Sequence, residues 1–418
     1  MSKKSFILVL YDDLNIGNFS ENLFYALLKG ERLNKKVKLV RKWIFCDRFL
    51  GRIFTRRQLR GVYRLRSPFL ITKDCCIIKI VGLYYGFLFW INFISQSILW
   101  KLRLIENMKL QLVGREYQDL FNINLDATFD VNSIQQIDWA FLLNKDQKIS
   151  LYPQDEAKCQ AILHRLGVHP EQWYVCLHIR TGHYHGDHSS YHRNSHIENY
   201  IEAMRYIRSL GGVVIRLGDS VPLGHEDYYI DYPNTPFRSE LMDLFLIKHC
   251  RFFWGTNSGI LDTALLLGAP TLAVNVSDYL SVRPYKSVDL FIYKRIFSCV
   301  QKKIISFHEA FQIAGDIIHT NCNISVFERF NKEYKLIENT SEEIADAVKE
   351  MLNNLVCLSE ETVVQKKFKE ELNQCSYRWM REEHYAPHVE NACRVAIKTY
   401  FNGRVGKEFA ASYLYGDS

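Results

Sequence analysis

Residues 173–194 read WYVCLHIRTGHYHGDHSSYHRN, and this stretch decides the fold that the following residues repeat. Residues 174–179 are a short apolar run rich in β-formers, which predicts a strand that is buried on both faces. A polar loop of about 15 residues follows, whereas a connection from strand to helix usually takes ~2–6 residues. From its root onward, the loop carries five histidines and two arginines. The sequence therefore predicts that this loop contacts a ligand.

Strand-like and helix-like segments alternate through residues 195–275. Apolar runs predict strands at 213–217, 252–254 and 271–275, and apolar positions about one turn apart predict helices at 195–210, 238–250 and 260–267. Ser195 and Glu198 have the spacing of a capping box, which predicts that the first of these helices begins there. Strand–helix–strand units in series predict a parallel sheet with right-handed crossovers, and therefore an α/β fold.

Polar residues follow each of the predicted strands. Ligands of such sheets bind outside the carboxyl ends of the strands, and the candidate residues at those ends are His178, Arg180, Arg216, Gly218, Asp219, Gly255, Thr256, Asn257, Ser258, Gly259 and Asn275. The segment 255–259 (GTNSG) combines glycines, which permit close backbone approach, with donor groups at a predicted helix N-terminus. This combination favours a diphosphate or a carboxylate ligand, and an ordinary helix cap is the alternative. The positive charges of Arg180, Arg193 and Arg216 favour the anionic ligand over the ordinary helix cap.

Several of these motifs carry a resemblance to a known family. The order of the motifs resembles a bacterial family of glycosyltransferases found with surface-polysaccharide genes. The resemblance covers roughly residues 170–355. The motifs that carry it are 178–180 (HIR), 184–187 (YHGD), 193–194 (RN), 211–219 (GGVVIRLGD), 230–232 (IDY), 239–243 (SELMD), 250–259 (CRFFWGTNSG), 289–294 (DLFIYK) and 338–352 (ENTSEEIADAVKEML). The HxR motif is more distantly similar to that of GDP-fucose-dependent fucosyltransferases. Those enzymes have an acidic residue three positions after the arginine, where this chain has His183.

The resemblance implies two Rossmann-like domains facing a cleft, the GT-B-like glycosyltransferase architecture, with a nucleotide-sugar donor bound by the second domain and no metal or other cofactor. The donor-binding residues that we then expect are His178, Arg180, Arg193, Asn194, Arg216, Gly218, Asp219, Ser239, Glu240, Gly255, Thr256, Asn257, Ser258 and Gly259. His185 and Asp187 are the first candidates for the general base that deprotonates an acceptor hydroxyl.

The length of 418 residues favours two domains. We expect residues 1–165 to form an acceptor-side domain, 166–355 the nucleotide-sugar-binding domain, and 356–418 to form helices that pack back on the first domain. Residues 5–11 predict a first strand and a helix follows through Leu28, so the loop between them would face the cleft. Asp12, Asp13 and Glu21 are therefore candidates for acceptor contact or base, with a solvated loop as the alternative.

The 11 cysteines are odd in number and scattered, and they form no CxxC motif. This pattern is typical of reduced thiols in a cytosolic protein. Residues 1–11 do not have the pattern of a secretory signal, so the expected location is cytoplasmic.

Charge and hydrophobicity are concentrated in residues 29–103. Residues 29–66 hold 14 Lys/Arg against Glu31 and Asp47, and residues 75–100 are an apolar run with interspersed polar and aromatic residues. Together they favour peripheral attachment to an anionic membrane surface on the inner face of the cell membrane. A buried pair of core helices and a true span are the alternatives. Nucleic acid is not the expected partner, because no nucleic-acid-binding module accompanies the basic block.

Two other functions compete with sugar transfer to a glycan, glycolipid or protein acceptor. One is a metal-dependent hydrolase that uses the histidine loop 178–192, since histidines and a carboxylate at short spacing are typical metal ligands. The other is a catalytically inactive, membrane-associated binding protein.

Overall fold

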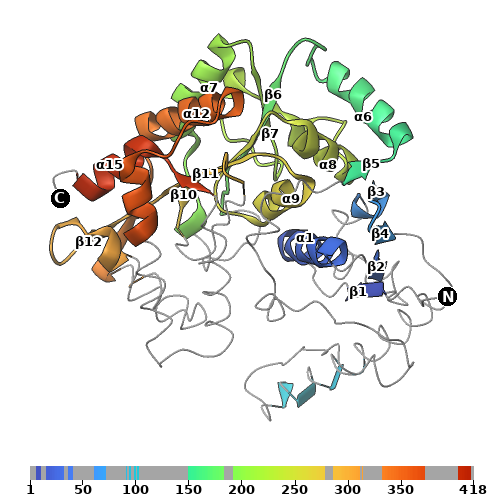
Figure 1. Cartoon of the computed structure of the whole chain (residues 1–418), viewed down its shortest axis with the longest axis horizontal. Helices are drawn as coiled ribbons and strands as arrows, with labels where there is room; N and C mark the ends of the chain where they lie inside the picture. The colour runs from blue at the N-terminus through green and yellow to red at the C-terminus, as the bar shows by residue number, and fades with distance from the viewer. Residues whose placement is uncertain are drawn as a thin grey trace.

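In the computed structural model, the chain forms two parallel sheets with helices packed on them (Figure 1). The structure describes residues 6–10, 16–32, 36–40, 61–71, 91, 94–95, 98–99, 101–102, 149–182, 192–277, 286–310, 313, 332–371 and 403–415. The prediction of an α/β fold built on parallel strands is confirmed.

The first sheet belongs to the N-terminal part of the chain. Strand β1 (Phe6–Leu10) leads through helix α1 (Ile16–Arg32) to β2 (Lys36–Val40), and β4 (Leu70–Ile71) adds a third strand in the order β1-β2-β4. All pairings are parallel. The predicted first strand and the helix that follows it are therefore confirmed. A short helix η2 (Val62–Arg64) and strand β3 (Leu65–Arg66) follow, and β3 pairs antiparallel with β5 (Ser150–Leu151).

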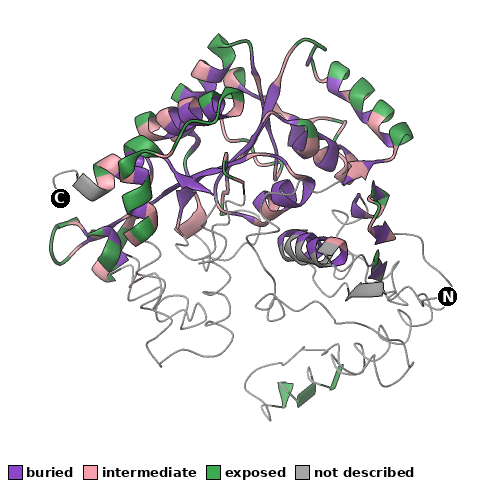
Figure 2. Ribbon diagram, viewed as in Figure 1, coloured by how far each residue is buried: buried purple, intermediate pink, exposed green. Residues whose placement is uncertain are grey.

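The second sheet has seven parallel strands in the order β15-β11-β10-β9-β6-β7-β8. Its strands are β6 (Tyr174–His178), β7 (Val213–Arg216), β8 (Ile230–Asp231), β9 (Phe253–Gly255), β10 (Thr271–Val276), β11 (Leu290–Tyr293) and β15 (Arg404–Val405). The four predicted strands form its centre. Their side chains are buried on both faces, as expected for strands covered by helices on both sides (Figure 2).

Helices cover both faces of this sheet (Figure 1). Helix α7 (Ile201–Ser209), preceded by η5 (Ile197–Tyr200), packs with α12 (Ser341–Val356) on one face. Helices α8 (Glu240–His249) and α9 (Gly259–Leu267) pack together on the other, with α6 (Pro153–Arg165) against α8. Short turns η6 (Glu226–Tyr228) and η7 (Tyr232–Asn234) flank β8, and β12 (Arg295–Ser298), β13 (Lys303–Ile304) and β14 (Tyr334–Ile337) form a small antiparallel sheet.

The predicted capping box at Ser195 and Glu198 is wrong. The helical segment begins at Ile197, and its N-cap, His196, makes no side-chain cap hydrogen bond. The Ser195 hydroxyl instead donates to Glu338, 143 positions away. A capping box does occur at α12, where the Thr340 Oγ1 accepts from the Glu343 N–H and the Glu343 carboxylate accepts from the Thr340 N–H.

The two parallel sheets are joined through helices α1 and α9. A Cβ at Gly17 would lie 3.2 Å from the carbonyl carbon of Gly259 and closer still to its Cα, so the first turns of the two helices touch backbone to backbone. One turn later, the Ser20 and Thr263 hydroxyls form a buried hydrogen bond of 3.0 Å. The N-terminal part of the chain therefore packs directly against the start of α9.

The described end of the C-terminal segment packs on the second sheet. The sequence predicts that residues 356–418 pack back on the first domain, and this prediction is wrong for residues 403–415. Strand β15 pairs with β11, and helix α15 (Lys407–Tyr415) packs on α12. The Glu350 carboxylate fixes this segment, because it accepts hydrogen bonds from the Lys407 N–H and the Gln365 amide, both 2.8 Å long. Residues 372–402 lie outside the described part.

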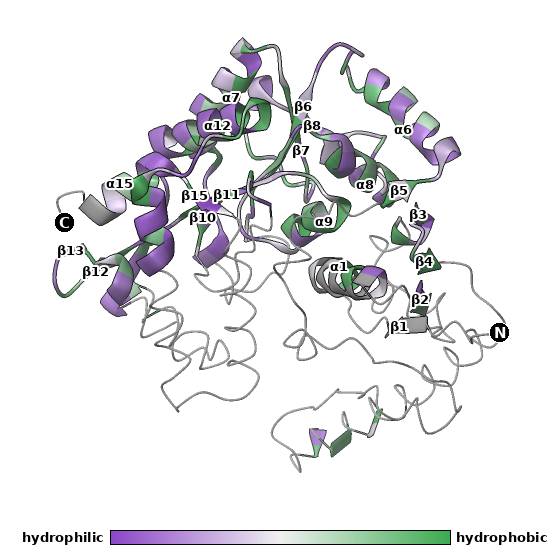
Figure 3. Cartoon of the chain, viewed as in Figure 1, coloured by the Kyte–Doolittle hydropathy of each residue, from purple (hydrophilic) through white to green (hydrophobic). Residues whose placement is uncertain are grey.

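The five described cysteines, Cys159, Cys176, Cys250, Cys299 and Cys357, are free thiols, as the sequence predicts for its cysteines. Within the described residues, none of the helices is both long enough and apolar enough to cross a membrane. Of the residues 87–90 and Ile94, whose burial would separate a core segment from a surface segment, only Ile94 is described, and its exposed fraction is 52%. Hydrophobic residues prevail along the strands of the second sheet, whereas α6, α7 and α12 carry many hydrophilic residues (Figure 3).

Candidate functional site

The candidate site lies at the carboxyl edge of the second sheet, where the topology brings the polar strand ends together. His178 ends β6, Arg216 ends β7, Gly255 ends β9, and Lys294 directly follows β11. Because all these strands are parallel, their carboxyl ends lie on the same edge.

His178 lies at the centre of this edge. The Ser258 hydroxyl is 3.0 Å from the Nδ1 of His178, and Gly218 and Gly255 lie so close that a Cβ at either would collide with His178. Burial lowers the pKa of His178 to about 4, although Asp219 opposes this shift. The imidazole is therefore neutral at neutral pH, and its two nitrogens offer one donor and one acceptor.

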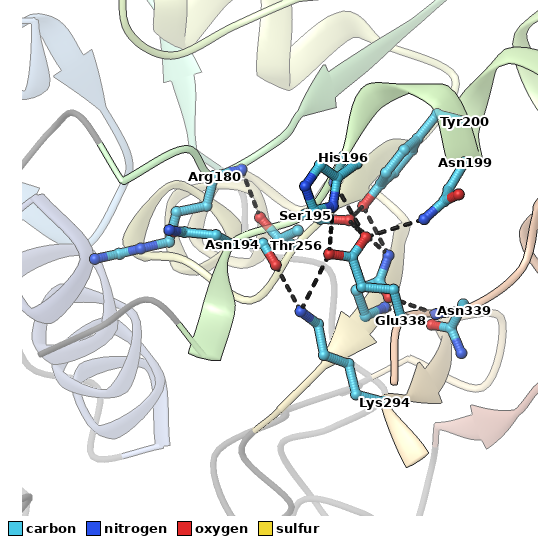
Figure 4. A network of polar contacts seen from close by, with 11 residues as sticks. Arg180, Asn194, Ser195, His196, Asn199, Tyr200, Thr256, Lys294, Glu338 and Asn339 are labelled. Atoms are coloured by element: carbon cyan, nitrogen blue, oxygen red, sulfur yellow. Dashed lines mark hydrogen bonds and ion pairs between the residues drawn. The ribbon is translucent and has the colours of Figure 1, made fainter. Parts of the chain in front are cut away.

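The root of the histidine loop is tied to β9 and to the end of β7. The Arg180 N–H donates to the buried Thr256 hydroxyl at 2.9 Å, and the Thr181 hydroxyl donates to Asp219 at 3.1 Å. The Arg180 side chain extends away from these contacts, as Figure 4 shows. Thr256 and Asp219, both predicted to bind the donor, are therefore used by the protein to hold the strand end that carries Arg180.

Arg216 ends β7, as the sequence predicts, but its side chain is paired within the protein. Its side chain is 1% exposed, its Nε donates to Asp231 at 2.6 Å, and its Nη1 lies 3.9 Å from Asp219. Two carboxylates therefore balance its charge within the protein. This geometry favours a role in holding β7 against β8, and it moves the expected anion contact from Arg216 to Arg180 and Arg193.

Ser239 and Glu240 lie at the start of α8. The Ser239 hydroxyl accepts from the Met242 N–H at 3.2 Å, which is an ordinary N-cap, and its own N–H donates to the Tyr232 hydroxyl at 2.9 Å. The Glu240 carbonyl lies against Gly61, where a Cβ would be 2.6 Å from the oxygen. Both residues have local structural partners here.

The turn into α9 has an unusual cap. Ser258 is the N-cap, but its hydroxyl bonds to His178 instead of to a helical N–H. The first amides of α9 consequently receive no side-chain cap from this residue, and they stand beside Asn257, which is partly exposed. Gly259, the first residue of α9, packs against Gly17 of α1.

Basic side chains gather where the chain re-enters the site at residues 192–194. Burial, together with the charges of Arg193, Arg180 and Lys294, lowers the pKa of His192 to about 3. The Lys294 ammonium donates to the carbonyl of Asn194 at 2.5 Å. Positive charge from the residues that follow β6 and β11 and from the end of the histidine loop is thus concentrated around His192, at the carboxyl edge of the sheet.

A polar network links this re-entry segment to β10, β11 and the start of α12 (Figure 4). At its centre, the Glu338 carboxylate accepts hydrogen bonds from the Ser195 hydroxyl, the His196 N–H and ring, and the Asn199 amide. The Asn275 side chain donates to the Ser195 and Tyr200 hydroxyls, and Asn275 and Asn339 exchange two backbone-to-side-chain hydrogen bonds of 2.7 Å each.

Sequence reasoning did not identify Lys294 and Glu338 as site residues. Their positions were nevertheless a usable signal, because each is a charged residue that directly follows a strand, β11 and β14 respectively. Lys294 is 3% exposed, and burial lowers its pKa while Glu338 partly offsets the shift. Burial alone would raise the pKa of Glu338, but Lys294 and the hydrogen bonds from His196 and Ser195 outweigh it and lower the pKa.

The three predicted catalytic residues, Asp13, His185 and Asp187, lie outside the described residues, and so does Asp12. Of Glu21, the structure describes the backbone, in the second turn of α1. Within the described residues, no group of three or more His, Cys, Asp or Glu side chains has the arrangement of a metal site. His183, His185 and His188 are not among those residues, so the metal-site alternative in this loop stays open.

The family models and the curated proteins offer no match to this chain. Among solved structures, the chain is similar to a family 9 glycosyl transferase from Veillonella parvula, at 12% identity and a TM-score of 0.37 over 64% of this chain and 80% of that one. It is also similar to the ADP-heptose lipopolysaccharide heptosyltransferase II of E. coli, at 12% identity and a TM-score of 0.32 over 64% and 84%. A third similar structure is the dodecameric iron-containing heptosyltransferase TibC in complex with ADP-D-beta-D-heptose, at 12% identity and a TM-score of 0.28 over 65% and 58%.

Proposed function

We propose that this protein is a glycosyltransferase that moves a sugar from a nucleotide-sugar donor to an acceptor hydroxyl. The observation that carries the proposal is the concentration of Arg180, Arg193 and Lys294 around the neutral His192 at the carboxyl edge of the second sheet, the edge at which α9 also begins. Fixed cations and helix N-terminal amides at one place favour an anionic ligand. A nucleoside diphosphate, which is the leaving group of such a donor, fits this chemistry.

In the proposed reaction the acceptor oxygen bonds to the anomeric carbon, and the bond between that carbon and the diphosphate oxygen breaks. Negative charge then grows on the departing diphosphate, where Arg180, Arg193 and the α9 amides would stabilise it. Cations that the fold already holds in place stabilise such charge without reorganisation during the reaction. Asp219 and Arg216 would contribute indirectly, by fixing the ends of β6 and β7.

The acceptor proton must pass to a general base. His185 and Asp187 remain our first candidates, with Asp13 as the candidate from the N-terminal loop. His178 and His192 are poor candidates, because their pKa values of about 4 and about 3 make them weak bases at neutral pH. We propose a metal-independent reaction that acts in surface glycan or glycolipid synthesis at the cytoplasmic side of the membrane.

A nucleotide panel tests the donor class. At a hundredfold excess over Kd, a ligand that binds only the folded protein adds ~2.7 kcal/mol of stability. We expect one of GDP, UDP, CDP, CMP and dTDP to raise the Tm, and Arg180→Ala to remove most of that shift. Arg251→Ala is the matched control, because Arg251 lies two residues before the amino end of β9, at the opposite edge of the sheet, and stacks on Trp173.

Two outcomes would contradict the proposal. One is a complete absence of a thermal shift with all five nucleotides. The other is an equal loss of the shift in Arg180→Ala and Arg251→Ala, which would show that binding does not depend on the cations at the carboxyl edge.

The role of the histidine loop has its own test. We expect Asp187→Asn to lower turnover by about a hundredfold, the scale of general-base catalysis, while the affinity for the donor nucleotide changes little. Treatment with a chelator should leave turnover unchanged. Inhibition by the chelator that zinc reverses would favour the metal-dependent hydrolase.

A further inference from the structure

Residues 183–191 connect two described stretches, 180–182 and 192–200, that the protein holds side by side. The Ser195 N–H donates to the Arg180 carbonyl at 3.1 Å, so the departing and the returning chain are hydrogen-bonded to each other. The returning stretch carries His192 and Arg193 and the departing one carries Arg180. The relative position of these three basic residues therefore depends on what fixes residues 192–200.

Glu338 is the main group that fixes this returning stretch. Its Oε2 accepts from the Ser195 hydroxyl at 2.9 Å and from the His196 N–H and the Asn199 amide at 3.0 Å each, and its Oε1 lies 2.8 Å from the His196 ring. A single carboxylate thus receives four hydrogen bonds from three residues of 195–199. Hydrogen bonds to a charged acceptor are stronger than neutral ones.

Lys294 fixes the same stretch from the neighbouring strand end. Its ammonium donates to the Asn194 carbonyl at 2.5 Å and lies 3.8 Å from the Glu338 carboxylate. Lys294 thereby contacts the residue next to Arg193 and balances the charge of Glu338. Both side chains come from elements far from residues 192–200 in the sequence.

The Lys294–Glu338 ion pair is largely buried, and the desolvation of its two charges costs free energy. The side chains of Lys294 and Glu338 are 4% and 18% exposed. An ion pair so far from water contributes little net stability, because the desolvation of both charges offsets their attraction. The hydrogen bonds from this pair to residues 194–199 account for its position better than a gain in stability does.

We propose that Glu338 and Lys294 are positioning residues. They hold residues 192–200 against β6, so that Arg193 and His192 stay beside Arg180, and the negative charge of Glu338 is required for this. The effect on a bound nucleotide rests on the function proposed above, whereas the effect on the chain itself does not.

The test compares Glu338→Gln with Glu361→Gln. Glu361 pairs with Lys369 at 2.6 Å, and its side chain is 18% exposed, as is that of Glu338. The control therefore removes an equally buried carboxylate charge beside a lysine, but away from the candidate site. In Glu338→Gln, an amide NH2 would face donors that now meet a carboxylate oxygen.

The first readout is brief digestion with trypsin, with mass spectrometry to follow cleavage after Arg180 and Arg193. We expect cleavage at these sites to be faster in Glu338→Gln by about tenfold, the scale of losing one hydrogen bond to a charged group, and unchanged in Glu361→Gln. Glu338→Asp, which keeps the charge, should restore part of the protection. Equal cleavage in Glu338→Gln and Glu361→Gln would overturn the proposal.

The second readout is the Kd of the nucleotide that stabilises the unmodified protein, together with the Tm. We expect Glu338→Gln to raise the Kd by about tenfold, on the same scale, while its Tm stays close to that of Glu361→Gln. An unchanged Kd would overturn the positioning role. If no nucleotide binds the unmodified protein, the proposed function fails, and the trypsin readout alone decides whether Glu338 holds the stretch.

Discussion

Replacing Gly255 by alanine should destabilise the protein strongly, because this residue brings β9 against β6 at the centre of the candidate site. Its φ is +140°, a region that side chains rarely adopt. A Cβ there would lie 2.8 Å from the carbonyl carbon of His178 and closer still to the carbonyl oxygen. All the nearest atoms belong to the backbone, so rotation of a side chain would not relieve the overlap.

The magnitude follows from three contributions. The backbone conformation costs an alanine about 1–3 kcal/mol. Separating the two strands weakens the hydrogen bond of 3.0 Å from the Thr256 N–H to the His178 carbonyl, a loss of about 1 kcal/mol. Repacking around the displaced strand adds about 1–3 kcal/mol, the typical cost of overpacking. We therefore expect a total destabilisation of about 3–7 kcal/mol.

Gly211→Ala is the matched control, since Gly211 also has a positive φ, +78°, but a Cβ there would meet no atom of the described residues within 4 Å. Only the backbone contribution remains at this position, about 1–2 kcal/mol. The difference of roughly 3 kcal/mol between the two variants corresponds to about 6–12 °C in Tm for a unit of 150–250 residues. Thermal unfolding followed by circular dichroism measures it. A Tm for Gly255→Ala within about 1 °C of that for Gly211→Ala would refute the reasoning.

Two further predictions concern pH and the membrane. The pKa of His178 is about 4 in the folded protein and about 6.5 in the unfolded chain, so the unfolded chain takes up the proton first on acidification. This residue therefore lowers the free energy of unfolding as the pH falls from about 6.5 toward 4. The Tm advantage of the unmodified protein over His178→Gln should therefore shrink across that range, and an advantage that grows would contradict it. On the membrane, Ile94 and Ile98 are each 52% exposed, so we expect Ile94→Glu/Ile98→Glu to lose most sedimentation with vesicles of anionic lipid. Val356→Glu/Val363→Glu, which adds the same charge at valines that are 77% and 80% exposed, should keep it, and equal sedimentation of both variants would contradict attachment through residues 29–103.

The sequence predicted the centre of the second sheet because local composition decides it. Strands β6, β7, β9 and β10 are buried on both faces. Each is a largely apolar run, because a strand that is covered on both faces needs apolar side chains on both. Their parallel order then fixes which polar residues share one edge. The convergence of His178, Arg180 and residues 255–259 was therefore available from the pattern alone.

The partners of the polar side chains were not available from the pattern, because they depend on contacts between distant segments. Arg216 pairs with Asp231 only because β7 and β8 are neighbours in register, with Arg216 opposite Asp231. Ser195 and Glu198 have the spacing of a capping box, yet the Ser195 hydroxyl bonds to Glu338. The prediction that residues 356–418 pack on the first domain failed for residues 403–415 for the same reason. The strand that attaches them to β11 consists of only two residues, Arg404 and Val405.

The packing of α1 on α9 gives the N-terminal part of the chain a direct influence on the candidate site. The start of α9 is fixed from the sheet side by the hydrogen bond between Ser258 and His178, and from the opposite side by Gly17 of α1. A displacement of α1 would therefore shift the same amides that are proposed to meet the diphosphate. Conversely, a ligand that binds those amides stabilises the contact between α1 and α9, because it binds only the arrangement in which α9 begins at this place. The two parallel sheets consequently share one element of the site, even though the basic side chains at this edge come from the second sheet and its loops.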